Sequence, residues 1–238
     1  MFEFFAIKVP VTSEEIRTQP DPPPAQSADQ RGVAIPSMVR FDLPVLRAEA
    51  VLQGYFLKYD DGDDHSFGTE RVAIRNVKIF GGLAVTFDVV VLMQDSDYLQ
   101  VPLGDTFHGS VDVLVLAELE DGLPHSTMSW RTSSVDFPLS PKVGRVLGGS
   151  VSFGKPVKWA HAMLKGLRTE YDSGDDDDNF VQEALVRVTR IQGDVVDFEA
   201  TFSLADWHLY VGQESQSMAE GQGQDVRAHL DVVILAEL

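Results

Sequence analysis

Two short acidic stretches contain the side chains of this sequence that are best suited to chemistry. The first is YDDGDD, which begins at Tyr59, and the second is YDSGDDDD, which begins at Tyr171. Calcium takes six to eight oxygen ligands, and carboxylates clustered around a glycine turn can supply them. We therefore predict a calcium site in each stretch, with candidate metal ligands at Asp60, Asp61, Asp63, Asp64, Asp172, Asp175, Asp176, Asp177 and Asp178.

Two other interpretations of these acidic loops stay open. Asp64 beside His65 suits acid–base chemistry, although the second stretch has Asp177 at the position of His65. Asp and Gly also favour exposed turns, in which the carboxylates are simply hydrated. Adjacent aspartates repel one another, so either a cation or solvent must screen them.

A third candidate site is an aromatic cluster formed by Trp207, His208 and Tyr210. The cluster opens a segment rich in Gly, Gln and Ser. Exposed aromatic rings on a polar loop can stack on a sugar or anchor a protein interface. We predict ligand binding here, with a glycan as the partner; the alternative is that Trp207 covers the edge of the core. The sequence has no nucleophile-elbow, P-loop or Rossmann motif, so we predict no catalytic residues and no required cofactor.

An internal repeat determines the predicted domain organisation. From Phe41 to His65, 12 of 25 positions match the residue 112 positions later. Both copies also end alike, in DVLVLAEL from Asp112 and DVVILAEL from Asp231. We predict a duplicated domain in four parts: an N-terminal arm and Pro-rich linker at 1–32, copy one at 33–119, a connector at 120–140 and copy two at 141–238.

The repeat also shows where the two copies differ. Trp159 stands where the first copy has Arg47, and His161 stands where it has Glu49. We expect His161 to lie on the surface. We expect the face that carries Trp159 to meet a partner or the other copy.

The local patterns are those of β-strands. In VDFEATFSL, apolar and polar residues alternate, which indicates a strand with one buried face. RAEAVLQGYFLKY has helical propensity, but its alternation favours a strand. RVAIRNVKI changes phase near Arg75 or Asn76, which predicts a bulge, and Gly81–Gly82 and Gly193–Asp194 predict hairpin turns. We predict an all-β fold of two tandem copies of a small antiparallel β-sandwich, preceded by a strand-like arm.

The order of these features resembles that of H-type lectin domains. Phe41 is followed by Pro44, an alternating strand, an acidic loop, a strand pair and a closing strand with Ala117 near its end. Those lectins are small six-stranded sandwiches that assemble as oligomers and bind sugars at their interfaces. The resemblance implies a lectin-like, carbohydrate-binding oligomer.

Composition limits the partners of this chain. It has 238 residues, with 19 basic and 37 acidic side chains and a formal net charge of −18. Such a field repels nucleic acids and anionic membranes and favours cations. Cysteine is absent, which excludes disulfides and thiolate metal sites. We expect no membrane span, because no apolar run approaches the roughly 20 residues that one needs.

The N-terminal stretch MFEFFAIKVP is an apolar arm without a basic region before it. We therefore expect cytoplasmic synthesis without a signal peptide, and release by a non-classical route stays open. The arm is expected to dock as a strand, either on its own sandwich or on a neighbouring subunit. The second arrangement makes the protein a homo-oligomer or part of a larger assembly.

These observations predict a non-catalytic binding or assembly protein built from β-sandwich domains, with carbohydrate-binding or calcium-dependent recognition. A structural component of a larger particle, of the phage-tail or injection-system type, is one alternative. An enzyme that uses the Asp64 and His65 cluster is the other.

Overall fold

The computed structural model describes residues 1–11, 32–59, 67–95, 107–120, 127–140, 145–171, 180–206 and 226–238. These residues form an all-β fold in which every paired strand is antiparallel and no helix occurs, which confirms the predicted fold class. The strands are β1 (Phe2–Val11), β2 (Val33–Arg40), β3 (Val45–Tyr59), β4 (Phe67–Phe80), β5 (Ala84–Asp95), β6 (Phe107–Leu119), β7 (Met128–Ser140), β8 (Arg145–Ser152), β9 (Trp159–Tyr171), β10 (Phe180–Gln192), β11 (Val195–Asp206) and β12 (Val226–Glu237).

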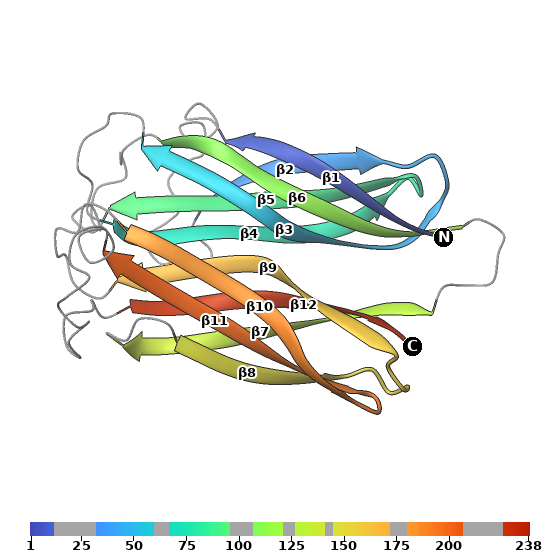
Figure 1. Ribbon diagram of the computed structural model, residues 1–238. Helices are drawn as coiled ribbons and strands as arrows, with labels where there is room; N and C mark the ends of the chain where they lie inside the picture. The colour runs from blue at the N-terminus through green and yellow to red at the C-terminus, as the bar shows by residue number, and fades with distance from the viewer. Residues whose placement is uncertain are drawn as a thin grey trace.

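The strands form three sheets (Figure 1). Two sheets have three strands each, in the orders β1-β6-β3 and β10-β11-β8, and the third has the order β2-β5-β4-β9-β12-β7. We call β1–β6 the first half and β7–β12 the second half. In each half, the first, sixth and third strands are neighbours, and so are the second, fifth and fourth. This shared order fits the sequence repeat, and duplication itself stays a prediction.

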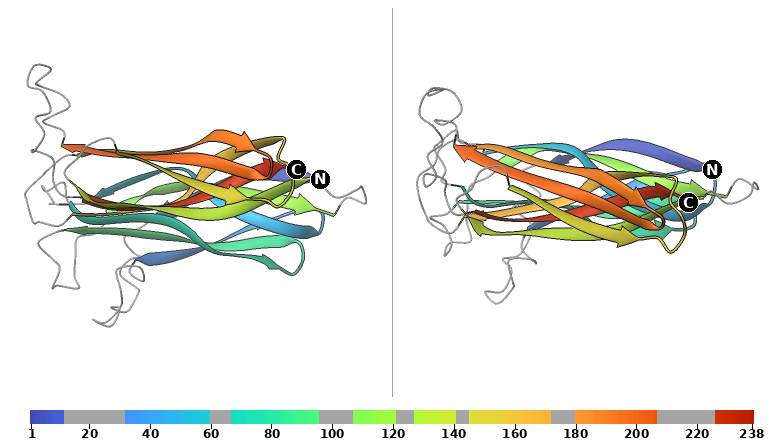
Figure 2. Two further views of the ribbon diagram at one scale, coloured as in Figure 1. Left: turned by 90° about the horizontal axis from the view of Figure 1, so that it is seen from below. Right: turned by 60° about the horizontal axis from the view of Figure 1, so that its bottom comes forward.

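Each half has its own hydrophobic core. The first core lies between β1-β6-β3 and β2-β5-β4, and the second lies between β7-β12-β9 and β8-β11-β10. Tyr55 on β3 and Leu164 on β9 pack against both cores. Both chain termini lie at the same end of the elongated strands in all three views (Figures 1 and 2).

The two halves share one sheet because β4 pairs with β9. The pairing runs from Thr69 opposite Glu170 to Ala73 opposite Gly166. A Cβ atom at Gly166 would lie 3.0 Å from the Cβ of Ala73, so the strands approach closely because this residue is glycine. A Cβ atom at Gly54, the equivalent position of the first half, would meet nothing within 4 Å.

The repeated Phe-x-x-Pro-Val motif has the same role in both halves. The backbone N–H of Phe41 donates to the carbonyl of Leu83 at 2.8 Å, and that of Phe153 donates to the carbonyl of Asp194 at 2.9 Å. The acceptors belong to the predicted hairpin turns, which are confirmed. Gly82 and Gly193 have φ angles of 75° and 62°, a region that glycine adopts without strain.

The predicted bulge is also confirmed. The β4–β5 register shifts between Arg75 and Lys78, and Asn76 has a φ angle of 54°. Asparagine tolerates this left-handed conformation better than most residues. Its side-chain amide donates to Asp88 Oδ2 at 2.6 Å, which holds the bulge against the neighbouring strand.

The predicted arm and connector both contain strands. β1 pairs with β6 of its own chain from Phe2 to Val11, and Val9 and Val11 are buried in the first core. Two placements were open for the arm, and in the structure it docks on the sandwich of its own chain. β7, within the predicted connector, pairs with β12. Its sequence is difficult to recognise as a strand because, of the side chains described in this strand, Val135 and Phe137 alone are buried.

Candidate functional site

The residues predicted from the sequence to bind a metal ion or another ligand lie outside the described part of the chain. This holds for all the aspartates of the two acidic stretches and for Trp207, His208 and Tyr210. Within the described ranges, no group of three or more His, Asp or Glu side chains is placed to hold a metal ion. Calcium binding and the role of the aromatic cluster therefore stay predictions.

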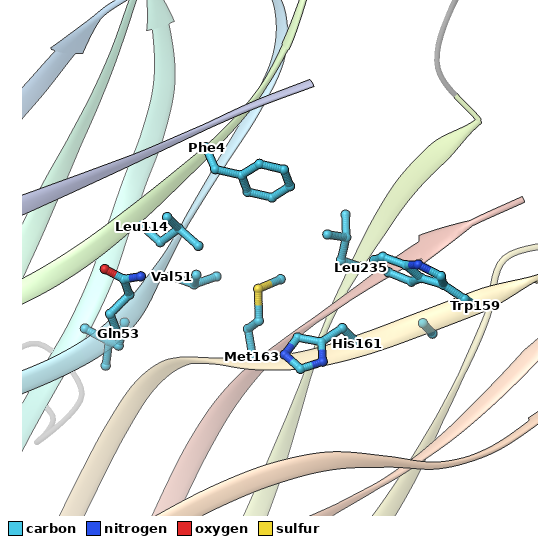
Figure 3. Close-up of a pocket in the computed structure, with 10 residues that line it drawn as sticks. Phe4, Val51, Gln53, Leu114, Trp159, His161, Met163 and Leu235 are labelled. Carbon is cyan, nitrogen blue, oxygen red and sulfur yellow. The ribbon is translucent and has the colours of Figure 1, made fainter. Parts of the chain in front are cut away.

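An open groove of about 590 Å³ lies between the two halves (Figure 3). Most of its lining side chains are aliphatic or aromatic. The first half supplies Phe4, Val51, Leu52, Gln53 and Leu114, and the second half supplies Trp159, Ala160, His161, Met163 and Leu235.

Strand alternation places the groove side chains. Trp159, His161 and Met163 are alternate residues of β9, so they project from the same face of the strand. Phe4 comes from β1 on the opposite wall. The rings of Phe4 and Trp159 border the same opening, and they are 54% and 44% exposed (Figure 3). The groove therefore has an aromatic side chain on each rim.

The floor of the groove belongs to a small apolar cluster shared by the two halves. Its buried members are Val51, Leu116 and Val233, and Leu114, Trp130 and Met163 pack against them. Because close-packed interiors deform little, this cluster fixes the walls relative to each other. The groove is thus formed before any ligand arrives.

Arg47 lies at the other edge of the same interface, where it lines a second open groove of about 630 Å³. Its guanidinium lies 4.7 Å from the centroid of the Trp130 ring, which belongs to the second half. It also pairs with Glu118 at 2.6 Å and donates to the carbonyl of Met128 at 2.7 Å. We call these four residues the Arg47 clamp. The clamp combines a cation–π contact with an ion pair across the two halves.

A second ion pair crosses the interface beside the clamp. Lys165 Nζ on β9 lies 2.9 Å from Glu49 Oε1 on β3. Both side chains are largely buried, with 20% and 9% of their surface exposed. The same Glu49 oxygen accepts the backbone N–H of Ala50 at 3.0 Å. These contacts satisfy a carboxylate that would otherwise be costly to bury.

The groove and the Arg47 clamp occupy equivalent places in the two halves. Trp159 stands 112 residues after Arg47. Phe4 on β1 corresponds to Trp130 on β7, because each pairs with the equivalent leucine of the sixth strand of its half. The interface therefore has two comparable edges, each with an open groove: about 630 Å³ beside Arg47 and Trp130, and about 590 Å³ beside Phe4 and Trp159.

The ion pair beside the clamp also has a counterpart in the groove. His161 stands 112 residues after Glu49, and Gln53 stands 112 residues before Lys165. Both His161 and Gln53 are exposed groove residues, as expected for His161 from the sequence. The groove therefore presents two polar side chains where the clamp edge has a buried ion pair.

A histidine flanked by two carboxylates lies elsewhere on the second half. His229 Nδ1 is 2.6 Å from Asp136 Oδ1, and Nε2 is 3.1 Å from Asp231 Oδ1. The hydrogen bond to Asp231, opposed by burial and reinforced by Asp136, raises the pKa of His229 to about 9. The imidazolium therefore donates both of its N–H groups at neutral pH.

Tyr55 joins the two cores and has a polar partner. Its hydroxyl lies 3.4 Å from Glu70 Oε2. Burial, with the charge of Glu70, raises the pKa of Tyr55 far above its usual value. The phenol thus stays protonated at every ordinary pH, which suits a structural hydrogen bond.

The sequence identified one wall of the groove and missed the other. The replacement of Arg47 by Trp159 in the repeat predicts that this face meets a partner or the other copy. Phe4 gave no such signal, because its place opposite Trp159 depends on how the halves pack. Hydrophobic alternation alone could not reveal a groove between two modules.

Among the described residues, no helix is long and apolar enough to cross a membrane.

Comparison with known proteins identifies no relative of this chain. No protein-family model, no curated protein and no solved structure matches this chain.

Proposed function

We propose that this chain is a non-catalytic recognition protein and that the groove between its halves is the ligand site. The observation that carries the proposal is the pair of exposed rings, Phe4 and Trp159, on the two rims of a preformed apolar groove. Ligand sites are typically concave and mostly apolar, with a few polar groups that fix orientation. Gln53 and His161 supply such groups here.

Two ligand classes suit aromatic rims of this kind. Sugar rings stack on indole through their C–H faces, and glycan binding is what the lectin resemblance implies. Organic cations bind the faces of Trp and Phe electrostatically. Both classes would alter the fluorescence of Trp159, so one assay can screen them.

The test is a binding screen that uses tryptophan fluorescence and thermal shift. A glycan array and a panel of small organic cations serve as probes. We expect at least one class to bind the parent protein and to lose affinity by about tenfold in Trp159→Ala, because a stacked ring contributes more than about 1 kcal/mol. The matched control is Phe80→Ala, which removes a 65% exposed ring outside the groove.

The control separates the groove from other surfaces. Phe80→Ala is expected to bind like the parent. Equal losses in Phe80→Ala and Trp159→Ala, or hits that ignore Trp159, would show that the ligand site is elsewhere, for example at Trp207.

A role in assembly is the second candidate function, and exposed strand edges favour it. β3 and β10 are end strands of their three-stranded sheets, and they carry Phe56 and Leu185, which are 59% and 55% exposed. Unpaired edges with apolar side chains are templates for strand addition from another chain. This arrangement suits a homo-oligomer or a component of a larger particle.

The assembly candidate is tested by mass in solution. We expect light scattering to show an oligomer that dissociates in Phe56→Lys with Leu185→Lys, because charged edge residues block strand addition. A monomeric parent protein would count against assembly through these edges.

A further inference from the structure

We propose that the groove binds a guanidinium group, namely an arginine side chain presented by a partner protein. The inference rests on the proposed function, since it names the ligand class of the same groove. It is argued from the equivalence between the groove and the Arg47 clamp, in which the chain supplies such a group itself.

The Arg47 clamp shows how this interface holds a guanidinium. The cation lies over the Trp130 ring, 4.7 Å from its centroid, while Glu118 neutralises it at 2.6 Å. The carbonyl of Met128 accepts a further hydrogen bond. An aromatic face, a carboxylate and a carbonyl therefore surround one planar cation, which matches the donor geometry of arginine.

The groove has an aromatic face in its lining and the carboxylate of Glu237 next to it on β12, but the equivalent of Arg47 is not an arginine. Phe4 takes the place of Trp130, and Glu237 takes the place of Glu118, because each pair occupies the same register in its half. Trp159 replaces the arginine and adds a second aromatic face. A guanidinium that enters from outside would therefore lie against the rings of Trp159 and Phe4, near Glu237.

Glu237 is placed to serve as the counter-ion. It lies directly opposite Trp159 in the β9–β12 register, and cross-strand partners project from the same face. Glu237 pairs with Lys158 at 3.2 Å, but Lys158 is 61% exposed. Exposed pairs of this kind contribute little, so an incoming guanidinium can share or displace the lysine.

The charge of the whole chain favours the same ligand. With a formal net charge of −18, the protein attracts cations and repels anionic partners. A groove of about 590 Å³ has ample room for the end of one arginine side chain. A neutral sugar gains nothing from this field, so the observations favour the cation.

The test compares N-acetyl-arginine amide with its citrulline analogue, which has nearly the same shape but no charge. Binding is followed by calorimetry and by tryptophan fluorescence. We expect the arginine compound to bind and the citrulline compound to bind at least about tenfold more weakly, because a desolvated cation–π contact contributes up to about 2 kcal/mol. Glu237→Gln should weaken arginine binding without affecting folding, and Phe80→Ala should leave it unchanged.

Trp159→Arg provides a variant that is expected to fold. It recreates the arginine of the clamp beside Glu237 and Phe4, so it should fill the groove, keep or raise the melting temperature and abolish binding of the arginine compound. Retained binding in this variant would overturn the proposal.

The guanidinium site and the groove as a ligand site can fail separately. Equal binding of arginine and citrulline, or no binding of either while a glycan binds and depends on Trp159, would overturn the guanidinium site and leave the groove as the ligand site. No response of Trp159 to any probe would overturn both.

Discussion

The guanidinium of Arg47 on β3 lies 4.7 Å from the ring centroid of Trp130 on β7, and this contact joins the two halves of the chain. Arg47 belongs to the first half and Trp130 to the second. Glu118 completes the arrangement at 2.6 Å. The interface between the halves is therefore bridged by an arginine at one edge, whereas the equivalent position at the other edge is Trp159, beside the groove.

Removing Arg47 is expected to destabilise the protein. Arg47→Ala leaves the Glu118 side chain, which is only 5% exposed, without its counter-ion. We expect a loss of about 2 kcal/mol in the free energy of unfolding, less than the roughly 3–5 kcal/mol for a fully buried pair, because Arg47 itself is 42% exposed. Urea denaturation measures the change.

Arg187→Ala is the matched control for Arg47→Ala. Arg187 pairs with Glu199 at 2.9 Å, but its side chain is 75% exposed. Its removal should change stability by less than about 0.5 kcal/mol, because exposed pairs contribute little. Similar losses in both variants would contradict the role given to the clamp.

Adding a methyl group at Gly166 is expected to strain the junction of the halves. The new Cβ would lie 3.0 Å from both Ala73 Cβ and Asp231 Oδ2, so we expect Gly166→Ala to cost about 1–2 kcal/mol. Gly54→Ala is the control, since its Cβ meets nothing within 4 Å, and it should be neutral or slightly stabilising. Thermal melts of both variants decide the point, and equal effects would contradict the close approach of β4 and β9.

Stability is expected to fall at high pH because of His229. Its pKa is raised to about 9, so the protonated form is favoured in the folded state. The resulting stabilisation is complete below the unfolded pKa of about 6.5 and is lost as the pH rises through about 9. Melting temperatures measured between about pH 6 and pH 10 should show this fall in the parent protein.

Asp136→Asn tests the cause of the pH dependence. It removes the carboxylate 2.6 Å from His229 Nδ1, so the fall between about pH 7 and pH 10 should become smaller. An unchanged profile would show that other groups dominate the alkaline loss of stability.

The N-terminal strand is expected to contribute to the fold of its own chain. Val11 is 1% exposed in the first core, so Val11→Ala should cost about 2 kcal/mol. Lys8→Ala, at a side chain that is 66% exposed, is the control and should be nearly neutral. A melting temperature that rises with protein concentration would instead indicate docking on a neighbouring subunit.

The acidic stretches are expected to bind calcium. Adding calcium should raise the melting temperature of the parent protein, because a ligand that binds only the folded state stabilises it. Asp63→Asn combined with Asp175→Asn should abolish the rise, since each stretch loses one carboxylate. A parent protein whose melting temperature ignores both calcium and a chelator would exclude these sites.

Much of the local structure follows from neighbouring residues in the sequence. The alternation around Phe198 and Phe202 predicts a strand, and both side chains are buried in the second core. The phase change near Asn76 predicts the bulge, and the glycines at positions 82 and 193 predict the turns. These features depend on side-chain period and backbone conformation, which a short stretch of sequence determines.

Local sequence patterns do not predict which distant strands pair with each other. Among the β7 side chains that the structure describes, two are buried, Val135 and Phe137, so the pattern is too weak to identify this segment as a strand. β7 forms a strand by pairing with the edge of β12, a segment distant in the sequence. The partner of the N-terminal arm is equally hard to predict from the sequence, because an apolar strand can dock on any open sheet edge.

The all-β class, the repeat and the replacement of Arg47 by Trp159 can all be read from the residues alone. Three contacts are visible only in the folded chain: β4 pairs with β9, Arg47 reaches Trp130, and Phe4 lies across a groove from Trp159. The physical reason is that hydrophobic period specifies which face of a strand is buried, while the contacts between two sheets depend on how their outer faces pack.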